Sequence, residues 1–439
     1  MHMTGPAQAG HGYLVPKRQA WIAFALAFLL MTFDFIDRQI IVSMFPYLKA
    51  DWGLSDTQLG ALTSVVSVTI AVFTFPLSLL IDRWSRVKSV VAMGIVWSLA
   101  TIACGFATTY QQLLIARGFI GLGEAGYGPA AGAILSSMFP TRMRATIIGG
   151  FLAAASFGAV LGVVLGGVIA ARWGWQSAFG IVGVPGLVVA VLFMYVRDYR
   201  APELKVGASQ EAGIVWAIAA GLFCARSGLA ACFAGALQVI TASTVIAWLP
   251  SYFNRIYGQP ADRSGVWAAA IIICATAGAV VWANVADRFA DRDVRFRMLT
   301  PAACSVVTLI VFATAFGALN PGPLQIAMLV LGAFVMTGTT GPVPAVVIDV
   351  VHPALRSTAG SVVAVIQNLF GLGLGLLLSG ALSDAFGLQA AMAIMPVSSG
   401  LAALLLVLGS RFYPADRAAV TNLQVRAEDL DVVPQPAGA

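Results

Sequence analysis

The stretches "LSLLIDRWSRVKS" at residues 77–89 and "WANVADRFADRDVR" at residues 282–295 carry the same Asp-Arg pair after a long apolar run. Asp82 and Asp287 lie 205 positions apart. Two further pairs keep the same spacing, namely Gly53 with Gly258 and Gly60 with Gly265. Landmarks that recur at a constant offset indicate two homologous halves, an arrangement found in membrane proteins built from repeats.

The composition places both halves in a membrane. The chain has 439 residues, of which 59% are hydrophobic and 10% charged, and its mean hydropathy is +0.88. Soluble domains are typically about 25% charged, and crossing a bilayer takes about 20 apolar residues per helix. Apolar runs of that length begin near residues 20, 57, 88, 110, 144, 176, 229, 262, 298, 323, 356 and 389.

These runs predict an all-α integral membrane protein with twelve transmembrane helices in two pseudo-symmetric six-helix bundles. The longest polar break separates the sixth run from the seventh. We expect a cytoplasmic N-terminal segment at 1–19, a first bundle at 20–196, a linker with an interfacial helix at 197–228, a second bundle at 229–411 and a disordered cytoplasmic tail at 412–439.

The distribution of basic residues predicts the orientation of the helices. With the N-terminus inside, eighteen Lys and Arg residues fall in cytoplasmic segments and four on the opposite side. Cytoplasmic loops are the positive ones, so we expect both termini in the cytoplasm and the chain in a cell inner membrane. This bias also explains the net charge of +6 without a nucleic-acid partner.

The sequence contains no pattern typical of a metal-binding or cofactor-binding site. The five cysteines lie in apolar runs without a CxxC pair, and none of the three histidines is near a cysteine. We therefore interpret the cysteines as small apolar residues and expect neither metal nor cofactor. The residues concerned are Cys104, Cys224, Cys232, Cys274, Cys304, His2, His11 and His352.

Charged residues interrupt two of the apolar runs. In "FDFIDRQII", residues 33–41, Asp34, Asp37 and Arg38 share one face of a helix. Arg117 and Glu124, seven positions apart, share a face of the fourth helix. Because each charge near a bilayer centre costs at least about 2.5–3.5 kcal/mol, such residues face a polar cavity or pair with one another.

Two interpretations of these charges remain open. In the first, Asp34, Asp37 and Glu124 exchange protons, while Arg38 and Arg117 bind an anionic substrate through bidentate guanidinium contacts. In the second, Asp37–Arg117 or Arg38–Glu124 is a static bridge between helices. Further candidates for substrate binding come from the second half and are Gln238, Thr241, Gln367 and Asn368.

The chain resembles the major facilitator superfamily over essentially its full length. The loop "SLLIDRWSRVK" is similar to the family signature G-x-x-x-D-R-x-G-R-R/K, with Ser78 and Ser85 in place of the glycines. The resemblance implies alternating access between the halves and a conformational latch. We expect this latch at Asp82, Arg83, Arg86, Asp287 and Arg288.

A glycine run, "GAVLGVVLGG" at residues 158–167, is similar to a pattern that the family associates with antiporters, but Val163 replaces its proline. Close helix packing is the alternative explanation of the glycines. Symport and antiport therefore both stay open.

Within the superfamily, "FDFIDRQI" and "RGFIGLGEAGYGPA" most resemble the Spinster-like branch. Asp37 and Arg38 match the end of its N-Y-x-D-R motif, whereas Asp34 replaces the asparagine; Arg117 and Glu124 match its R-x-x-x-G-x-G-E motif. The branch implies a proton-coupled transporter of lysophospholipids or sphingolipids, working as a monomer. The anion–cation symporter branch, which carries sugar acids with protons, shares these motifs and is the alternative.

An enzymatic role for the two aspartates is the remaining alternative. Asp34 and Asp37 could share a proton as a hydrolytic dyad. Intramembrane aspartyl proteases bring their carboxylates from separate helices, however, and no second aspartate motif is present. We therefore expect no enzyme activity.

Overall fold

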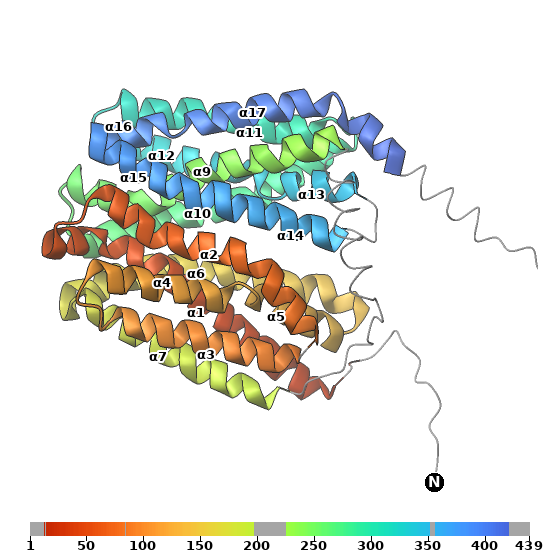
Figure 1. The fold of residues 1–439 in the computed structure, drawn as a ribbon. Coiled ribbons are helices and arrows are strands. Elements are labelled where there is room, and N and C mark those ends of the chain that lie inside the picture. Colours follow the sequence, from red (N-terminus) through yellow and green to blue (C-terminus); the bar gives the residue numbers. More distant parts are fainter. Residues whose placement is uncertain (1–12, 14, 84, 197–224, 352–355, 421–439) are drawn as a thin grey trace, which may run out of the picture. The chain divides into compact units, whose positions relative to one another are not determined.

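Helices make up almost all of the chain that the structure describes (Figure 1). The structure, a computed structural model, describes residue 13 and residues 15–83, 85–196, 225–351 and 356–420. No β-strand occurs in these ranges. The predicted all-α class is confirmed.

The helices of the first half of the sequence are α1 (Lys17–Trp52), α2 (Asp56–Arg83), α3 (Arg86–Cys104), α4 (Tyr110–Glu124), α5 (Tyr127–Met138), α6 (Arg144–Trp173) and α7 (Trp175–Leu192). Those of the second half are α9 (Arg226–Arg255), α10 (Ala261–Ala290), α11 (Phe296–Gly317), α12 (Pro323–Met336), α13 (Pro342–Asp349), α14 (Arg356–Ile366), α15 (Leu374–Phe386), α16 (Leu388–Ile394) and α17 (Val397–Ser410). A π-helical segment, Gln367–Gly373, joins α14 to α15.

Eleven helical segments of the described chain are long and apolar enough to cross a membrane. The remaining predicted span, the fourth along the sequence, begins at Tyr110 as expected but is divided into α4 and α5 by a break at Ala125 and Gly126. Each expected span begins within three residues of its predicted position. Hydrophobic length therefore located the spans, although it could not locate the break.

The internal repeat is visible in the backbone. Gly53 and Gly258 have φ angles of 63° and 64°, a left-handed conformation that favours glycine, and each follows a long helix. Gly60 and Gly265 also have equivalent surroundings, because a Cβ atom on either would collide with the backbone of another helix. Each of these two pairs of glycines, 205 positions apart, therefore has the same structural role in the two halves of the sequence.

Contacts divide the chain into two units. Unit 1 comprises residues 1–203, 244–273 and 373–391; unit 2 comprises residues 204–243, 274–372 and 392–439. Unit 1 thus holds the six spans of the first half together with all of α15 and parts of α9, α10 and α16. The predicted division into two six-helix bundles differs from this grouping and stays a prediction.

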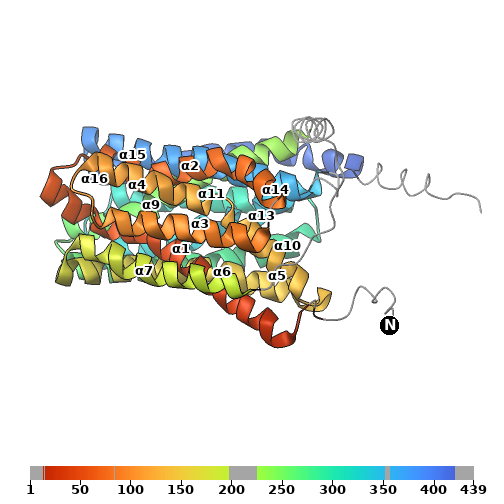
Figure 2. The ribbon, with the colours of Figure 1, turned by 60° about the horizontal axis from the view of Figure 1, so that its bottom comes forward.

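In unit 1, α1 packs along α6, and α3 lies between α4 and α7 (Figures 1 and 2). Glycines of α6 form the contact with α1, since a Cβ atom on each would meet a backbone carbonyl of α1. The pairs are Gly158 with Thr32, Gly162 with Ile36 and Gly166 with Ile40. Close packing therefore accounts for the glycine run.

In unit 2, the described start of the C-terminal tail is helical, which differs from the prediction. Residues 413–420 are helical, within the segment expected to be disordered. Tyr413 is buried, and its hydroxyl donates to Asp349 at 2.7 Å, while Asp416 accepts from the backbone and hydroxyl of Ser227. The prediction for the start of the tail was wrong because it rested on the polar composition of the segment, which does not reveal the hydrogen bonds of Tyr413 and Asp416.

Replacing Gly162 by leucine should destabilise the protein. The side chain would meet the carbonyl of Ile36 and the side chain of Gln39, and overpacking of this kind costs about 1–3 kcal/mol or more. We expect a clearly lower unfolding temperature in detergent, measured by intrinsic fluorescence.

Gly149→Leu is the matched control, because Gly149 lies on the same helix with nothing within 4 Å of the added Cβ. Equal unfolding temperatures for the two variants would contradict the packing role of the glycine run.

Candidate functional site

Helix α1 carries three ionisable side chains near its middle. Asp34 and Asp37 are buried, at 3% and 1% exposure, whereas the Arg38 side chain is 22% exposed. The sequence predicts that all three share one face of α1 and that Arg117 and Glu124 share a face of α4. The structure separates the five residues into two clusters, which we call the shared-arginine cluster (Asp34, Arg38 and Glu124) and the sealed pair (Asp37 and Arg117).

In the shared-arginine cluster, one nitrogen serves two carboxylates. The Arg38 Nε lies 2.9 Å from Asp34 Oδ1 and 3.0 Å from Glu124 Oε2. This nitrogen carries one hydrogen, which it donates to Asp34. Neither carboxyl oxygen of Glu124 has a hydrogen-bond partner among the described residues. Glu124 is therefore a buried acidic group beside a cation that is already engaged.

The rest of the Arg38 guanidinium is available. Its two terminal nitrogens make no hydrogen bond within the described chain, and its carbon lies 5.0 Å from the centre of the Phe35 ring. Two parallel N–H groups match the two oxygens of a carboxylate or phosphate. Within this cluster, Arg38 is the group that can receive an anion from outside.

The sealed pair is enclosed by its neighbours. Arg117 has no exposed surface, and its Nη1 is 3.8 Å from Asp37 Oδ1, beyond hydrogen-bonding distance. The guanidinium instead donates to the backbone carbonyls of Leu62 and Asp37. Asp37 accepts a hydrogen bond from the Thr101 hydroxyl at 2.8 Å. The structure does not place Arg117 where a substrate could touch it, because α1, α2, α3 and α4 close around it.

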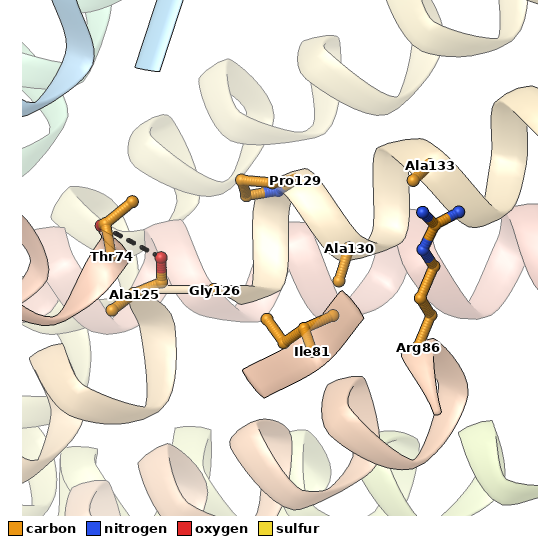
Figure 3. Close-up of a pocket in the computed structure, with 8 residues that line it drawn as sticks. All are labelled: Thr74, Ile81, Arg86, Ala125, Gly126, Pro129, Ala130 and Ala133. Carbon is orange, nitrogen blue, oxygen red and sulfur yellow. Dashed lines mark hydrogen bonds between the residues drawn. The ribbon is translucent and has the colours of Figure 1, made fainter. Parts of the chain in front are cut away.

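Glu124 is the last residue of α4, directly before the helix break. The Thr74 hydroxyl lies within hydrogen-bonding distance of the carbonyl of Ala125 in the break, at 3.1 Å, and of the Ile70 carbonyl, at 2.6 Å; Figure 3 shows the first of these contacts. A cavity of about 80 Å³ lies here between α2, α3 and α5, with Arg86 at one end. Ligand pockets are typically about 300–1,000 Å³, so this cavity suits water better than a substrate.

The candidates in unit 2 differ in accessibility. Gln238 and Thr241 are buried. Gln238 donates to the Met336 carbonyl, and Thr241 bonds to the hydroxyls of Ser398 and Ser399, so both join helices of the unit. Gln367 and Asn368 are half-buried and are the first two residues of the π-helical segment. π-helical turns are frequent at functional sites. Gln367 and Asn368 are therefore better placed than the buried Gln238 and Thr241 for the predicted role in substrate binding, which stays a prediction.

The predicted latch is described only in part. Asp82 and Arg83 end α2, but their side chains lie outside the described residues. In unit 2, Asp287 pairs with Arg297 at 3.0 Å, and Arg297 also pairs with Asp349 at 2.5 Å; Arg288 lies next to Asp287 on α10. Burial, together with the hydrogen bond to Asp349, raises the pKa of Tyr413 to about 12, so this hydroxyl stays a donor at neutral pH.

Sequence reasoning missed a third charged centre in unit 1, around Asp56 at the start of α2. Arg255 of α9 binds both carboxylate oxygens of Asp56, at 2.7 and 2.8 Å, and Lys49 of α1 approaches to 2.7 Å. Ser383 of α15 donates to Asp56 at 2.5 Å. Asp384 in turn accepts from the backbone N–H groups of Asp56 and Thr57, and so caps α2 from another helix.

A signal for this centre was present in the sequence. Lys49 and Arg255 are two of only four basic residues on the side predicted to be non-cytoplasmic, and Asp56 follows the turn at Gly53. An acidic residue close in sequence to one of these few cations is a candidate partner for an ion pair on that side. The distance in sequence between Asp56 and Arg255 hid the pairing.

Comparisons with known proteins agree with this fold. The Major Facilitator Superfamily profile matches residues 27–373. An MFS-type efflux pump of Mycolicibacterium smegmatis is 26% identical over 371 residues, covering 84% of this chain and 85% of the relative. A probable L-galactonate transporter of Escherichia coli is 27% identical over 285 residues, covering 62% of each chain.

Among solved structures, a bacterial homologue of the human lysosomal transporter Spinster, in an inward-facing and unoccupied conformation, has a TM-score of 0.82. It is 22% identical, and the match covers 92% of this chain and 99% of that one. At this level of identity the likeness concerns the fold.

Replacing Arg117 by methionine should strongly destabilise the protein, by about 3–5 kcal/mol, because it leaves Asp37 buried without its cation. The carbonyl of Leu62 would also lose its donor. We expect Asp37→Asn to recover part of the loss in the double variant. The unfolding temperature of the purified variants measures both effects. A stable Arg117→Met variant would contradict the importance of the sealed pair.

Proposed function

Since the chain belongs to the Major Facilitator Superfamily, we propose that it is a proton-coupled secondary transporter in which Arg38 holds an anionic substrate and Glu124 carries a proton. The family and the relatives are transporters, not enzymes. The chain is a multi-pass membrane protein. The coupling ion and the substrate are the parts that we propose.

The sharing of Arg38 between Asp34 and Glu124 carries this proposal. Two carboxylates and one guanidinium leave an excess negative charge when both acids are ionised. A buried carboxylate without hydrogen bonds is costly, so Glu124, which accepts none among the described residues, suits a proton. Protonation of Glu124 leaves a neutral cluster, which can then accept an anion at the terminal nitrogens of Arg38.

Proton and substrate are coupled through the charge of the same site. An anion that binds Arg38 weakens the hold of that guanidinium on Asp34 and Glu124, and a carboxyl group that loses its arginine partner takes up a proton more readily. Release of the anion restores the arginine to the carboxylates and frees the proton. Asp34, which has no counterpart in the resembled motif, supplies a second carboxylate that can share this work.

Asp37 and Arg117 have a different part in the proposal. Because both are sealed in the present conformation, they are coupled to the shared-arginine cluster through α1 and α4 and do not touch the substrate. We keep Asp37 as a proton carrier and assign Arg117 to holding it in place. Gln367 and Asn368 of unit 2 are proposed as further polar contacts.

We propose the membrane orientation from the distribution of the basic residues, and the type of membrane from the relatives. The excess of basic residues in one set of loops supports cytoplasmic termini. Bacterial relatives support an inner membrane. We propose a monomer in the lipid bilayer, with the substrate and protons as its partners.

The proposed substrate class is an amphipathic anion, such as a lysophospholipid or sphingolipid. The likeness in fold to the Spinster homologue and the matching residues of α1 and α4 support it. A small sugar acid is the alternative, supported by the galactonate relative. Both ligands bring one anionic group to Arg38.

Glu124→Gln should abolish uptake driven by a pH gradient while leaving substrate counterflow intact, because glutamine keeps the shape of the side chain but carries no exchangeable proton. Proteoliposomes with an imposed pH gradient provide the measurement. Driven uptake that survives in the variant would show that Glu124 does not couple transport to protons.

The substrate classes can be separated by competition. Labelled glucuronate and labelled lysophosphatidate are offered in turn to proteoliposomes, each against an excess of the other compound. For a lipid transporter, we expect lysophosphatidate uptake that glucuronate does not reduce. Uptake of glucuronate alone would replace the lipid with the sugar acid. Arg38→Ala should eliminate whichever uptake is found.

A further inference from the structure

Thr101 of α3 is the one polar side chain that hydrogen-bonds the carboxylate of Asp37 within the described chain. Its hydroxyl oxygen lies 2.8 Å from Asp37 Oδ2 and 2.9 Å from the carbonyl oxygen of Trp97. Thr101 is 1% exposed and Asp37 is equally buried. No sequence motif singled out this threonine.

The hydroxyl has a single hydrogen for these two acceptors. When Asp37 is ionised, the hydroxyl donates to the carboxylate. When Asp37 is protonated, the carboxyl group can donate to the hydroxyl oxygen, and the threonine hydrogen turns to the Trp97 carbonyl. Thr101 therefore has one hydrogen-bond arrangement for each protonation state, with no movement of heavy atoms.

The Asp37 carboxylate depends on this hydroxyl, because no other described side chain hydrogen-bonds it. Arg117 Nη1 donates to the backbone carbonyl of Asp37 and lies 3.8 Å from Oδ1, too far for a hydrogen bond, and Oδ1 has no hydrogen-bond partner among the described residues. The other ionisable groups near Asp37 are Asp34 and Arg38 of α1, Cys104 of α3, Arg117 and Glu124 of α4, and, beyond Asp34, Tyr127 of α5.

We propose that Thr101 is a positioning residue that sets the pH at which Asp37 exchanges its proton. Hydrogen bonds to an ionised group are roughly twice as strong as those between neutral groups. Loss of the hydroxyl therefore harms the ionised form of Asp37 more than the protonated form. This inference rests on the proposed proton coupling only where transport is the readout.

Thr101→Val tests the inference, since valine keeps the shape of threonine without its hydroxyl. We expect the pH of half-maximal uptake to rise by about one unit, the size expected for one hydrogen bond to a charged group. Thr101→Ser retains the hydroxyl and should restore the profile of the unmodified protein.

Thr308→Val is the matched control. Thr308 is buried in α11, and its hydroxyl bonds only to the carbonyl of Cys304 four residues earlier, within the described residues. The variant removes a buried hydroxyl of the same kind without touching a carboxylate. It should lower stability slightly and leave the pH profile unchanged.

Infrared spectroscopy of the purified protein gives a readout that does not depend on transport. The carbonyl band of protonated Asp37, identified by its loss in Asp37→Asn, is followed against pH. In Thr101→Val its midpoint should rise by about one unit. A midpoint unchanged from that of the unmodified protein, or a band that does not respond to pH, would overturn the role of Thr101.

The two proposals can fail separately. Uptake without pH dependence in the unmodified protein would remove the proposed proton coupling, whereas the infrared midpoint would still decide the role of Thr101. A shift in Thr101→Val that Thr101→Ser does not reverse would reduce the effect to packing and overturn the inference.

Discussion

A charge buried among membrane helices must have a partner, and this constraint organises unit 1. Asp37 has Arg117 and Thr101, Asp34 and Glu124 have Arg38, and Asp56 has Arg255 and Lys49. Each set joins different helices, so the cost of burying charge is offset only when these helices are correctly packed. The glycine contacts between α1 and α6 bring the backbones close enough for the arrangement to form.

The three centres differ in how completely they are paired. Asp56 has two cations and a hydroxyl, which leaves it fully satisfied, and its chemistry is structural. The sealed pair has distances that leave one oxygen and one nitrogen without hydrogen bonds. Glu124 has no hydrogen bond at all within the described chain. A proton or a ligand stabilises a buried charged group most where that group lacks hydrogen-bond partners. We therefore place the proposed function at Arg38 and Glu124.

The sequence predicted the membrane class, the starts of the spans and the pairing of α1 with α4, because hydrophobic length and helical periodicity are local properties. It could not separate Asp37 from Asp34 and Arg38, since the separation depends on how α3 and α4 close around α1. Arg117 was assigned to substrate by residue type, but its burial is a tertiary property. The break after Glu124 and the contacts of Tyr413 escaped for the same reason. The roles of all these residues in transport stay proposals.

The central claim is that an anion at Arg38 and a proton on the neighbouring carboxylates bind together. Titration calorimetry of the purified protein, repeated in buffers with different ionisation enthalpies, counts the protons exchanged on binding. With glucuronate or lysophosphatidate as the ligand, whichever binds, the account predicts uptake of about one proton per anion near neutral pH, the charge that one protonated carboxyl group removes from the cluster. Binding with no proton uptake, at any pH where the ligand binds, would contradict it.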